Sequence, residues 1–346
     1  MANDLFSQQE SNRRRSRWLV ASFIGFFLWL GLGGDWLAYV YTRDLPPAAY
    51  HHVLPLFGAV MAAVAAGIVL YIRKTGANTV LWSTGAREIT DPRTPGEQLL
   101  ANVVEEMAIA AGIPRPRVWV VDDPDPNAFA TGTDPMRAHI AVTTGLLDTV
   151  NRHELQAVIG HEMGHVKNLD TQLMTMAAGL VGAVALMSDG MGRILRYQMV
   201  GGRGGSSRVG GGGRSRDSNL GPLVAVVLVL WIVSWILAPI VTRLLAVGIS
   251  RQREYLADAM SAQFTRNPLA LASALEKIEA ASAPTTAIKG GVAHLCIADP
   301  LGRRMNLKEG FVADLLATHP PMALRVARLK AMGYQEQKAA GTFQSR

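Results

Sequence analysis

Two long apolar runs mark the N-terminal part of the chain. The first extends from Leu19 to Val40 and the second from Val53 to Ile72. Because a helix rises about 1.5 Å per residue, about 20 apolar residues suffice to cross the hydrocarbon core of a bilayer. Each run therefore predicts a transmembrane helix, giving a membrane segment over residues 18–72 that follows a polar stretch over residues 1–17.

The first run is too long for the apolar region of a signal peptide, and no small-residue cleavage site precedes the second run. An uncleaved membrane anchor is therefore expected. Asp35 lies within the first run, and we expect it near the outer interface because a carboxylate in hydrocarbon is costly. By the positive-inside rule, the N-terminus and the chain after Ile72 face the cytoplasm. The basic residues behind this orientation are Arg13, Arg14, Arg15, Arg17, Arg73 and Lys74.

Residues 73–172 have a mixed composition that predicts a folded unit outside the membrane. Apolar residues at helical spacing predict a helix over Pro95–Gly112. Asn151 is a candidate N-cap for a second helix, from Arg152 to about Leu169. Short apolar runs bounded by turn signals predict three strands, Arg117–Val121, Ala128–Thr131 and His139–Thr143.

Two further apolar runs follow, Leu173–Met187 and Leu223–Val241, and only the second is clearly long enough to span a bilayer. Between them lies a Gly/Arg-rich loop at 201–216, which its composition predicts to be flexible. Four crossings would place this basic loop outside, against the positive-inside rule. Residues 173–249 are therefore predicted to form a helical hairpin, which either does not fully cross or translocates its loop.

The C-terminal part, residues 250–346, is expected to be soluble and largely helical. Gly333 is expected to end the last helix. The predicted helices are Arg251–Thr265, Pro268–Ala281 and Pro320–Met332.

Composition agrees with a membrane protein. Of the 346 residues, 49% are hydrophobic and only 18% are charged, against about 25% charged in typical soluble domains. The net charge of +7 suits basic residues that flank membrane segments and face anionic lipid. No nucleic-acid-binding pattern accompanies it, so nucleic acid is not an expected partner. Cys296 is the only cysteine, so any transition metal must be held by histidines and carboxylates.

The strongest chemical signal is HEMGH, which contains His161, Glu162 and His165. Two imidazoles four residues apart lie on one face of a helix, one turn from each other, as two zinc–nitrogen bonds require. Glu162 stands beside the first ligand, where it can accept a proton from a water molecule as general base. The alternative is a solvated helix face that carries two histidines.

A zinc protease site needs a third protein ligand. Asn168 and Thr171 stand where the metzincin pattern requires Gly and His, so that class is excluded. The best candidate is Glu254, in SRQREYLADAMSA after the fourth apolar run. Asp258, one turn later, could accept a hydrogen bond from the outer nitrogen of a ligand histidine. The alternative is a solvated helix whose charges pair among themselves, namely Arg251, Arg253, Glu254 and Asp258.

Several motifs occur in the order found in one family. HEMGHVKNLD, SRQREYLADAMSA and THPPMALRVARL, with paired N-terminal membrane segments and PNAFATG at Pro126–Gly132, resemble the HtpX family of membrane zinc endopeptidases, relatives of the CAAX prenyl-protein endopeptidases. The resemblance covers nearly the whole chain, and the insert at 201–216 departs from it. It implies a mainly α membrane protein with transmembrane helices and a gluzincin-like α+β zinc protease domain containing a small β-sheet. The catalytic domain would comprise residues 73–172 and 250–346.

The resemblance also implies roles for single residues. Glu254 becomes the third ligand of one Zn²⁺ ion, and Asp258 supports a ligand histidine from outside. His319 is expected near the substrate oxyanion, where it helps to stabilise the transition state, with Arg325 nearby. An edge segment that pairs with an extended substrate backbone is expected. This segment consists of Asn127, Ala128 and Phe129.

The leading hypothesis is a zinc endopeptidase that cleaves membrane or membrane-associated proteins at the cytoplasmic face of the bacterial inner membrane. The resemblance implies quality control of misfolded membrane proteins, so protein substrates and the lipid bilayer are the expected partners. One alternative is a CAAX-type processing protease. Another is a non-enzymatic membrane scaffold with a vestigial zinc site, although a decayed site would be expected to lose Glu162 first.

Overall fold

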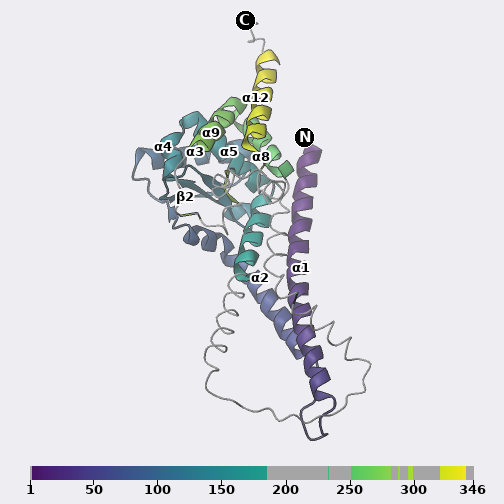
Figure 1. Ribbon diagram of the computed structural model, residues 1–346. Coiled ribbons are helices and arrows are strands. Elements are labelled where there is room, and N and C mark those ends of the chain that lie inside the picture. Colours follow the sequence, from purple (N-terminus) through teal and green to yellow (C-terminus); the bar gives the residue numbers. More distant parts are fainter. Residues whose placement is uncertain are drawn as a thin grey trace. The chain divides into compact units, whose positions relative to one another are not determined.

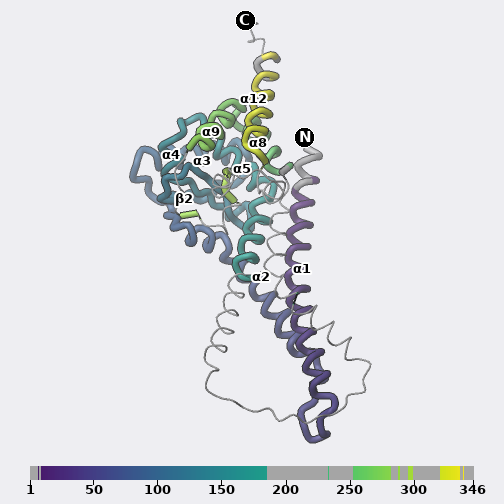
Figure 2. The backbone as a smooth tube through the Cα atoms, viewed as in Figure 1, coloured from purple at the N-terminus to yellow at the C-terminus, as the bar shows by residue number. Residues whose placement is uncertain are grey.

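The structure is a computed structural model that describes residues 2–184, 233, 251–281, 287–288, 295–298 and 320–339 (Figure 1). Figure 2 traces the same chain as a tube. The chain divides into two compact units. The α+β unit comprises Met1–Trp18, Tyr71–Gly179 and Leu245–Arg346, and the helix-pair unit comprises Leu19–Leu70 and Leu180–Leu244.

Among the described residues, two helices are long and apolar enough to cross a membrane, as predicted for the N-terminal runs. They are α1 (Ala2–Thr42), with a candidate span at Gln9–Thr42, and α2 (Leu56–Ser83). Both extend beyond their apolar runs, since α1 begins in the polar N-terminus and α2 continues past Ile72. Hydropathy marks the part of a helix that suits lipid and does not mark its backbone end, and Arg and Lys are good helix formers.

Asp35 joins the two helices within the helix-pair unit. Its carboxylate accepts hydrogen bonds from the backbone N–H groups of Phe57 (2.9 Å) and Gly58 (2.7 Å), and its Oδ1 lies 2.7 Å from Nε2 of His52. The first N–H groups of α2 have no partner within the helix, so an anion there is stabilising. Gly31 permits the close crossing, because a Cβ at this position would lie 2.5 Å from the Phe57 carbonyl oxygen.

The α+β unit contains a small mixed sheet. Strand β2 runs parallel to β4, whereas β1 and β3 pair antiparallel with β2 and β4. The three predicted strands are confirmed with the predicted bounds. Strand β1 was not predicted, because its two residues are too few to show an alternating pattern. The strand order is β1 (Arg87–Glu88), β2 (Arg117–Val121), β4 (His139–Thr143), β3 (Ala128–Thr131).

Helices pack around this sheet, and α3, α5 and α9 share one apolar core with the strands (Figure 1). Asn151 begins α5 as predicted, in a capping box with Glu154. A further helical stretch covers residues 170–184 after Leu169, whose φ is 62°. The other described helices are α3 (Pro95–Ala111), α4 (Thr144–Thr149), α5 (Arg152–Lys167), α8 (Arg251–Thr265), α9 (Pro268–Ala280) and α12 (Met322–Ala339).

The prediction for the last helix was wrong at its C-terminal end. We expected it to end at Gly333, but α12 continues through Gly333 to Ala339. A Cβ at Gly333 would lie 2.7 Å from a methyl carbon of Leu269 in α9. This glycine therefore allows two helices to approach closely and does not cap α12. The Gly/Arg-rich loop and nearly all of the fourth apolar run lie outside the described residues.

Small residues bring α5 and α8 into close contact. A Cβ at Gly164 would lie 3.2 Å from the Cα of Ala257, and one at Gly160 would lie 3.5 Å from the Cα of Ser261. The hydroxyl of Ser261 donates to the carbonyl oxygen of Ala157 at 2.5 Å. Two small residues one turn apart on each helix thus set a short distance between the helix backbones.

We expect Gly164→Val to destabilise the α+β unit by about 1–3 kcal/mol, because the added methyl groups meet the backbone of α8 and force the helices apart. Thermal unfolding of the detergent-solubilised chain measures this loss. Gly182→Val is the matched control, since a Cβ at Gly182 meets nothing within 4 Å. Equal melting temperatures for the two variants would contradict the packing argument.

Candidate active site

His161, His165 and Glu254 meet inside the α+β unit. One potential ligand atom from each lies within 4.8 Å of the other two, and all three residues are buried. Nε2 of His161 is 3.7 Å from Oε2 of Glu254, and Nε2 of His165 is 3.4 Å from Oε1. The two histidines come from one face of α5, and Glu254 comes from the first turn of α8. The close packing of these helices creates the cluster.

A second set of carboxylates contacts the outer nitrogens of both histidines. Nδ1 of His161 is 2.9 Å from Oδ1 of Asp258, and Nδ1 of His165 is 3.0 Å from Oδ2 of Asp170. A carboxylate at Nδ1 favours the tautomer that carries its proton there. In the neutral form of each ring, Nε2 then carries a lone pair toward the cluster, which is the arrangement found in metal sites.

Arg325, from α12, balances the negative charge of the cluster. Its Nε and Nη2 donate to the two oxygens of Asp258 at 2.9 and 2.7 Å. Its Nη1 lies 3.5 Å from Oε2 of Glu254, and the side chain is fully buried. Burial alone raises the pKa of Asp258, but the positive charge of Arg325 outweighs it and lowers that pKa.

Glu162 is buried beside the cluster, and no other described side chain donates a hydrogen bond to its carboxylate. Burial raises its pKa to about 7; the charge of His165 opposes this shift and that of Glu254 adds to it. The backbone of Ala130 in β3 also lowers this pKa slightly. Glu162 thus lies between the cluster and the edge strand of the sheet.

The two histidines have different pKa values. Burial lowers the pKa of His161 to about 4, so its ring is neutral at neutral pH. Burial acts in the same direction on His165, but the negative charges of Glu254, Asp170 and Glu162 outweigh it and raise that pKa to about 9. A metal ion that binds Nε2 of His165 therefore competes with a proton, and its binding would release that proton.

Two supporting residues were missed by sequence reasoning. Asp170 contacts His165 and ends the HEMGHVKNLD motif, so its position five residues after His165 was an available signal. Asn12 of α1 donates through Nδ2 to Oδ1 of Asp170 at 2.7 Å and to the Asn168 carbonyl oxygen at 2.9 Å. No local pattern could indicate a contact between residues 158 positions apart.

The predicted edge segment comprises Asn127 and the first two residues of β3, and the outer edge of β3 pairs with the chain's own segment 295–298. The N–H of Ile297 donates to the carbonyl oxygen of Ala128 at 2.9 Å. Phe129 and Cys296 form an antiparallel bridge. Edge strands expose backbone groups that can pair with another extended chain, and the described structure shows this edge in such a pairing.

Side chains of the site hold the same segment. Nδ2 of Asn127 donates to the Ala298 carbonyl oxygen at 2.9 Å, and Nη1 of Arg325 donates to the Ile297 carbonyl oxygen at 2.9 Å. Arg325 thus contacts both the segment that pairs with β3 and Asp258 behind the cluster. The structure therefore brings together the predicted ligands, Asp258 and the edge segment, whereas His319 lies outside the described residues.

We expect Asp258→Asn to weaken zinc affinity about 10- to 100-fold, as loss of a residue that orients a metal ligand usually does. The neutral amide lacks the charge that favours a proton on Nδ1 of His161. Competition with a chromophoric chelator measures the affinity, and circular dichroism checks the fold. Asp148→Asn, at an exposed position on α4, is the control. An unchanged affinity in Asp258→Asn would refute the supporting role.

Comparisons with known proteins agree with the sequence resemblance. A match to peptidase family M48 covers residues 96–333. A protease HtpX homologue of Streptococcus gordonii is 37% identical over 330 residues, covering 95% of this chain and 100% of the relative. A protease HtpX homologue of Caldanaerobacter subterraneus subsp. tengcongensis is 45% identical over 234 residues, covering 68% and 72%. The crystal structure of S. mikatae Ste24p matches with a TM-score of 0.45 and 16% identity, covering 94% of this chain and 67% of that chain.

The curated relatives are named as HtpX proteases, which does not favour the CAAX-type alternative. The similarity to the Streptococcus gordonii relative extends over nearly the whole chain, including the two described helices with the length and composition of membrane spans. The chain therefore belongs to peptidase family M48 and, within it, to the HtpX family of membrane metalloproteases.

Proposed function

We propose that this chain is a zinc-dependent endopeptidase that cleaves membrane or membrane-associated proteins at the cytoplasmic face of the bacterial inner membrane. The observation that carries the proposal is the buried meeting of His161, His165 and Glu254 beside the carboxylate of Glu162. So many ionisable groups are costly to bury together, and such clusters are characteristic of catalytic and metal sites.

The residues present fit a zinc ion. Two imidazole nitrogens and one carboxylate oxygen form a common ligand set of catalytic zinc sites, which keep a further position open. This set favours zinc over hard cations such as Mg²⁺, which prefer oxygen ligands alone. Asp258 and Asp170 hold the two rings in the required orientation. A zinc ion bound by these residues would supply a Lewis acid that polarises the scissile carbonyl group.

Glu162 acts as the general base. Its carboxylate accepts a proton from the attacking water and later returns it to the departing amine. A pKa of about 7 suits both steps, because the protonated and the ionised forms are then similarly populated near neutral pH. Its position between the cluster and β3 puts it beside the strand edge where a peptide backbone can lie.

An extended substrate is proposed to pair with the edge segment of β3 at Asn127–Phe129. Segment 295–298 already uses these backbone and side-chain atoms, which supports their capacity to bind a peptide backbone. Substrate and segment compete for this edge, so part of the substrate's binding energy is spent on displacing the segment. Backbone pairing reads sequence only weakly, which suits a protease that acts on many misfolded membrane proteins.

The family resemblance supplies the remaining parts of the proposal. His319 donates a hydrogen bond to the oxyanion of the transition state, a kind of interaction with a large catalytic effect. The basic residues on one side of the two N-terminal spans orient the catalytic domain toward the cytoplasm. Quality control of misfolded membrane proteins is the proposed cellular role, as the family resemblance implies.

We expect Glu162→Gln to lower the rate of cleavage about 10²- to 10⁴-fold while zinc content stays near one ion per chain, because the substitution removes the base and leaves the ligands in place. Cleavage of an unstructured protein substrate, self-cleavage and zinc content are measured on detergent-purified protein. Glu105→Gln, at an exposed position on α3, is the control and should retain full activity.

Two outcomes would contradict the proposal. If the wild-type chain holds no zinc after repletion, the metal site is refuted together with the mechanism. If wild type and Glu162→Gln bind zinc equally and neither cleaves any substrate, the non-enzymatic scaffold becomes the better interpretation.

A further inference from the structure

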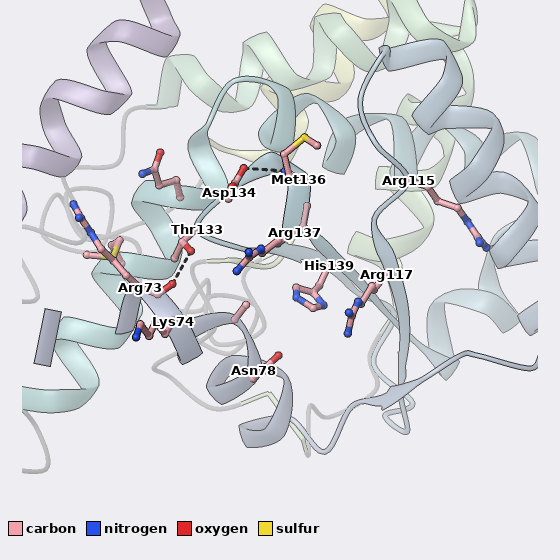
Figure 3. Close-up of a pocket in the computed structure, with 14 residues that line it drawn as sticks. Arg73, Lys74, Asn78, Arg115, Arg117, Thr133, Asp134, Met136, Arg137 and His139 are labelled. Atoms are coloured by element: carbon pink, nitrogen blue, oxygen red, sulfur yellow. Dashed lines mark hydrogen bonds between the residues drawn. The ribbon is translucent and has the colours of Figure 1, made fainter. Parts of the chain in front are cut away.

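A basic cavity of about 710 Å³ lies in the α+β unit (Figure 3). The strand register places it at the end of the sheet opposite to Asn127. Arg117 begins β2 and His139 begins β4, and the two are paired in register. Residues in the C-terminal half of α2 also line the cavity. The cations among its lining residues are Arg73, Lys74, Arg115, Arg117 and Arg137.

Few negative charges oppose these cations. Asp134 is the one carboxylate that lines the cavity, and its Oδ1 accepts a hydrogen bond from the backbone N–H of Met136 at 3.0 Å. Arg117 lies 3.8 Å from Glu88 in a long, exposed ion pair. Within the part of the chain that the structure describes, the other four cations form no ion pair. Such a concentration of one charge attracts a multivalent anion.

His139 adds a neutral polar group to the wall of the cavity. Its Nδ1 accepts a hydrogen bond from the indole N–H of Trp119 at 3.0 Å, so the ring proton of the neutral form lies on Nε2. Burial lowers the pKa of His139 to about 4, and the charge of Arg117 adds to this effect. The side chain is therefore a fixed neutral donor at physiological pH.

The position of the cavity along α2 indicates the source of the anion. Arg73 and Lys74 directly follow Ile72, the last residue of the second apolar run, within one continuous helix. At a rise of about 1.5 Å per residue, the lining residues Arg73–Asn78 lie within about 10 Å of the end of that run along the helix. This is the depth of lipid headgroups, where arginine and lysine meet anionic phosphates.

We propose that this cavity binds the phosphate headgroup of an anionic phospholipid. Planar guanidinium groups bind phosphate oxygens in a bidentate manner, and the ammonium group of Lys74 adds a point charge. Figure 3 shows Arg117, His139 and Arg137 along the strand ends and Arg73 and Lys74 on α2. The headgroup would thus join the end of the membrane helix to the sheet of the catalytic unit.

Native mass spectrometry of the full-length chain in detergent tests the proposal by titration with phosphatidylglycerol or phosphatidylcholine. The wild type is expected to retain phosphatidylglycerol in preference to phosphatidylcholine. Arg117→Gln/Arg137→Gln should weaken that binding about tenfold or more. Arg266→Gln/Lys330→Gln removes the same charge at exposed positions away from the cavity and should bind like the wild type. Both pocket arginines are exposed, and unchanged melting temperatures verify the fold.

Three results would overturn the assignment. Equal retention of the two lipids would remove the preference for an anionic headgroup, and equal binding by the two double variants would remove the cavity as the site. Inorganic phosphate, titrated alone in a parallel arm, distinguishes the source of the anion. If it binds the wild type, is lost in the pocket variant and phosphatidylglycerol does not bind, the ligand is a soluble phosphate and not a lipid.

Discussion

Gly160 and Gly164 on α5 face Ala257 and Ser261 on α8, and the distance that these small residues allow determines where Glu254 lies. The two histidines of the motif face the same way because they lie one turn apart on a single helix. The carboxylate comes from a distant part of the chain, so its position depends on helix packing. Larger side chains at this contact would leave the histidines intact and the ligand set incomplete.

The same packing buries an unusual amount of charge. Arg325 lies against the carboxyl groups of both Glu254 and Asp258. Removing one partner of a buried pair costs far more than the pair contributes, because the remaining charge stays unpaired in a low dielectric. Arg325 also donates to the carbonyl oxygen of Ile297, in the segment that pairs with β3. One side chain therefore links the residues behind the candidate metal ligands to the segment paired with the edge of β3.

Local pattern predicted much of this structure. Periodicity located β2, β3, β4 and the membrane-length helices, and spacing placed the two histidines on one face. The features that the local pattern did not predict depend on contacts between residues far apart in the sequence. Gly333 looked like a helix end because the approach of Leu269 is visible only in three dimensions. The pairing of segment 295–298 with β3 likewise depends on tertiary structure, because the local sequence of neither segment identifies the segment with which it pairs.

Asn12 has a consequence for how this enzyme can be handled. It belongs to the same unbroken helix that provides the first membrane span, and its amide supports Asp170 behind His165. Truncating the anchor to obtain a soluble catalytic fragment would also remove this support. The support behind His165 thus comes partly from the helix that carries the first membrane span, so a chain that lacks the start of α1 would lose this support even though α2 still holds that chain at the bilayer.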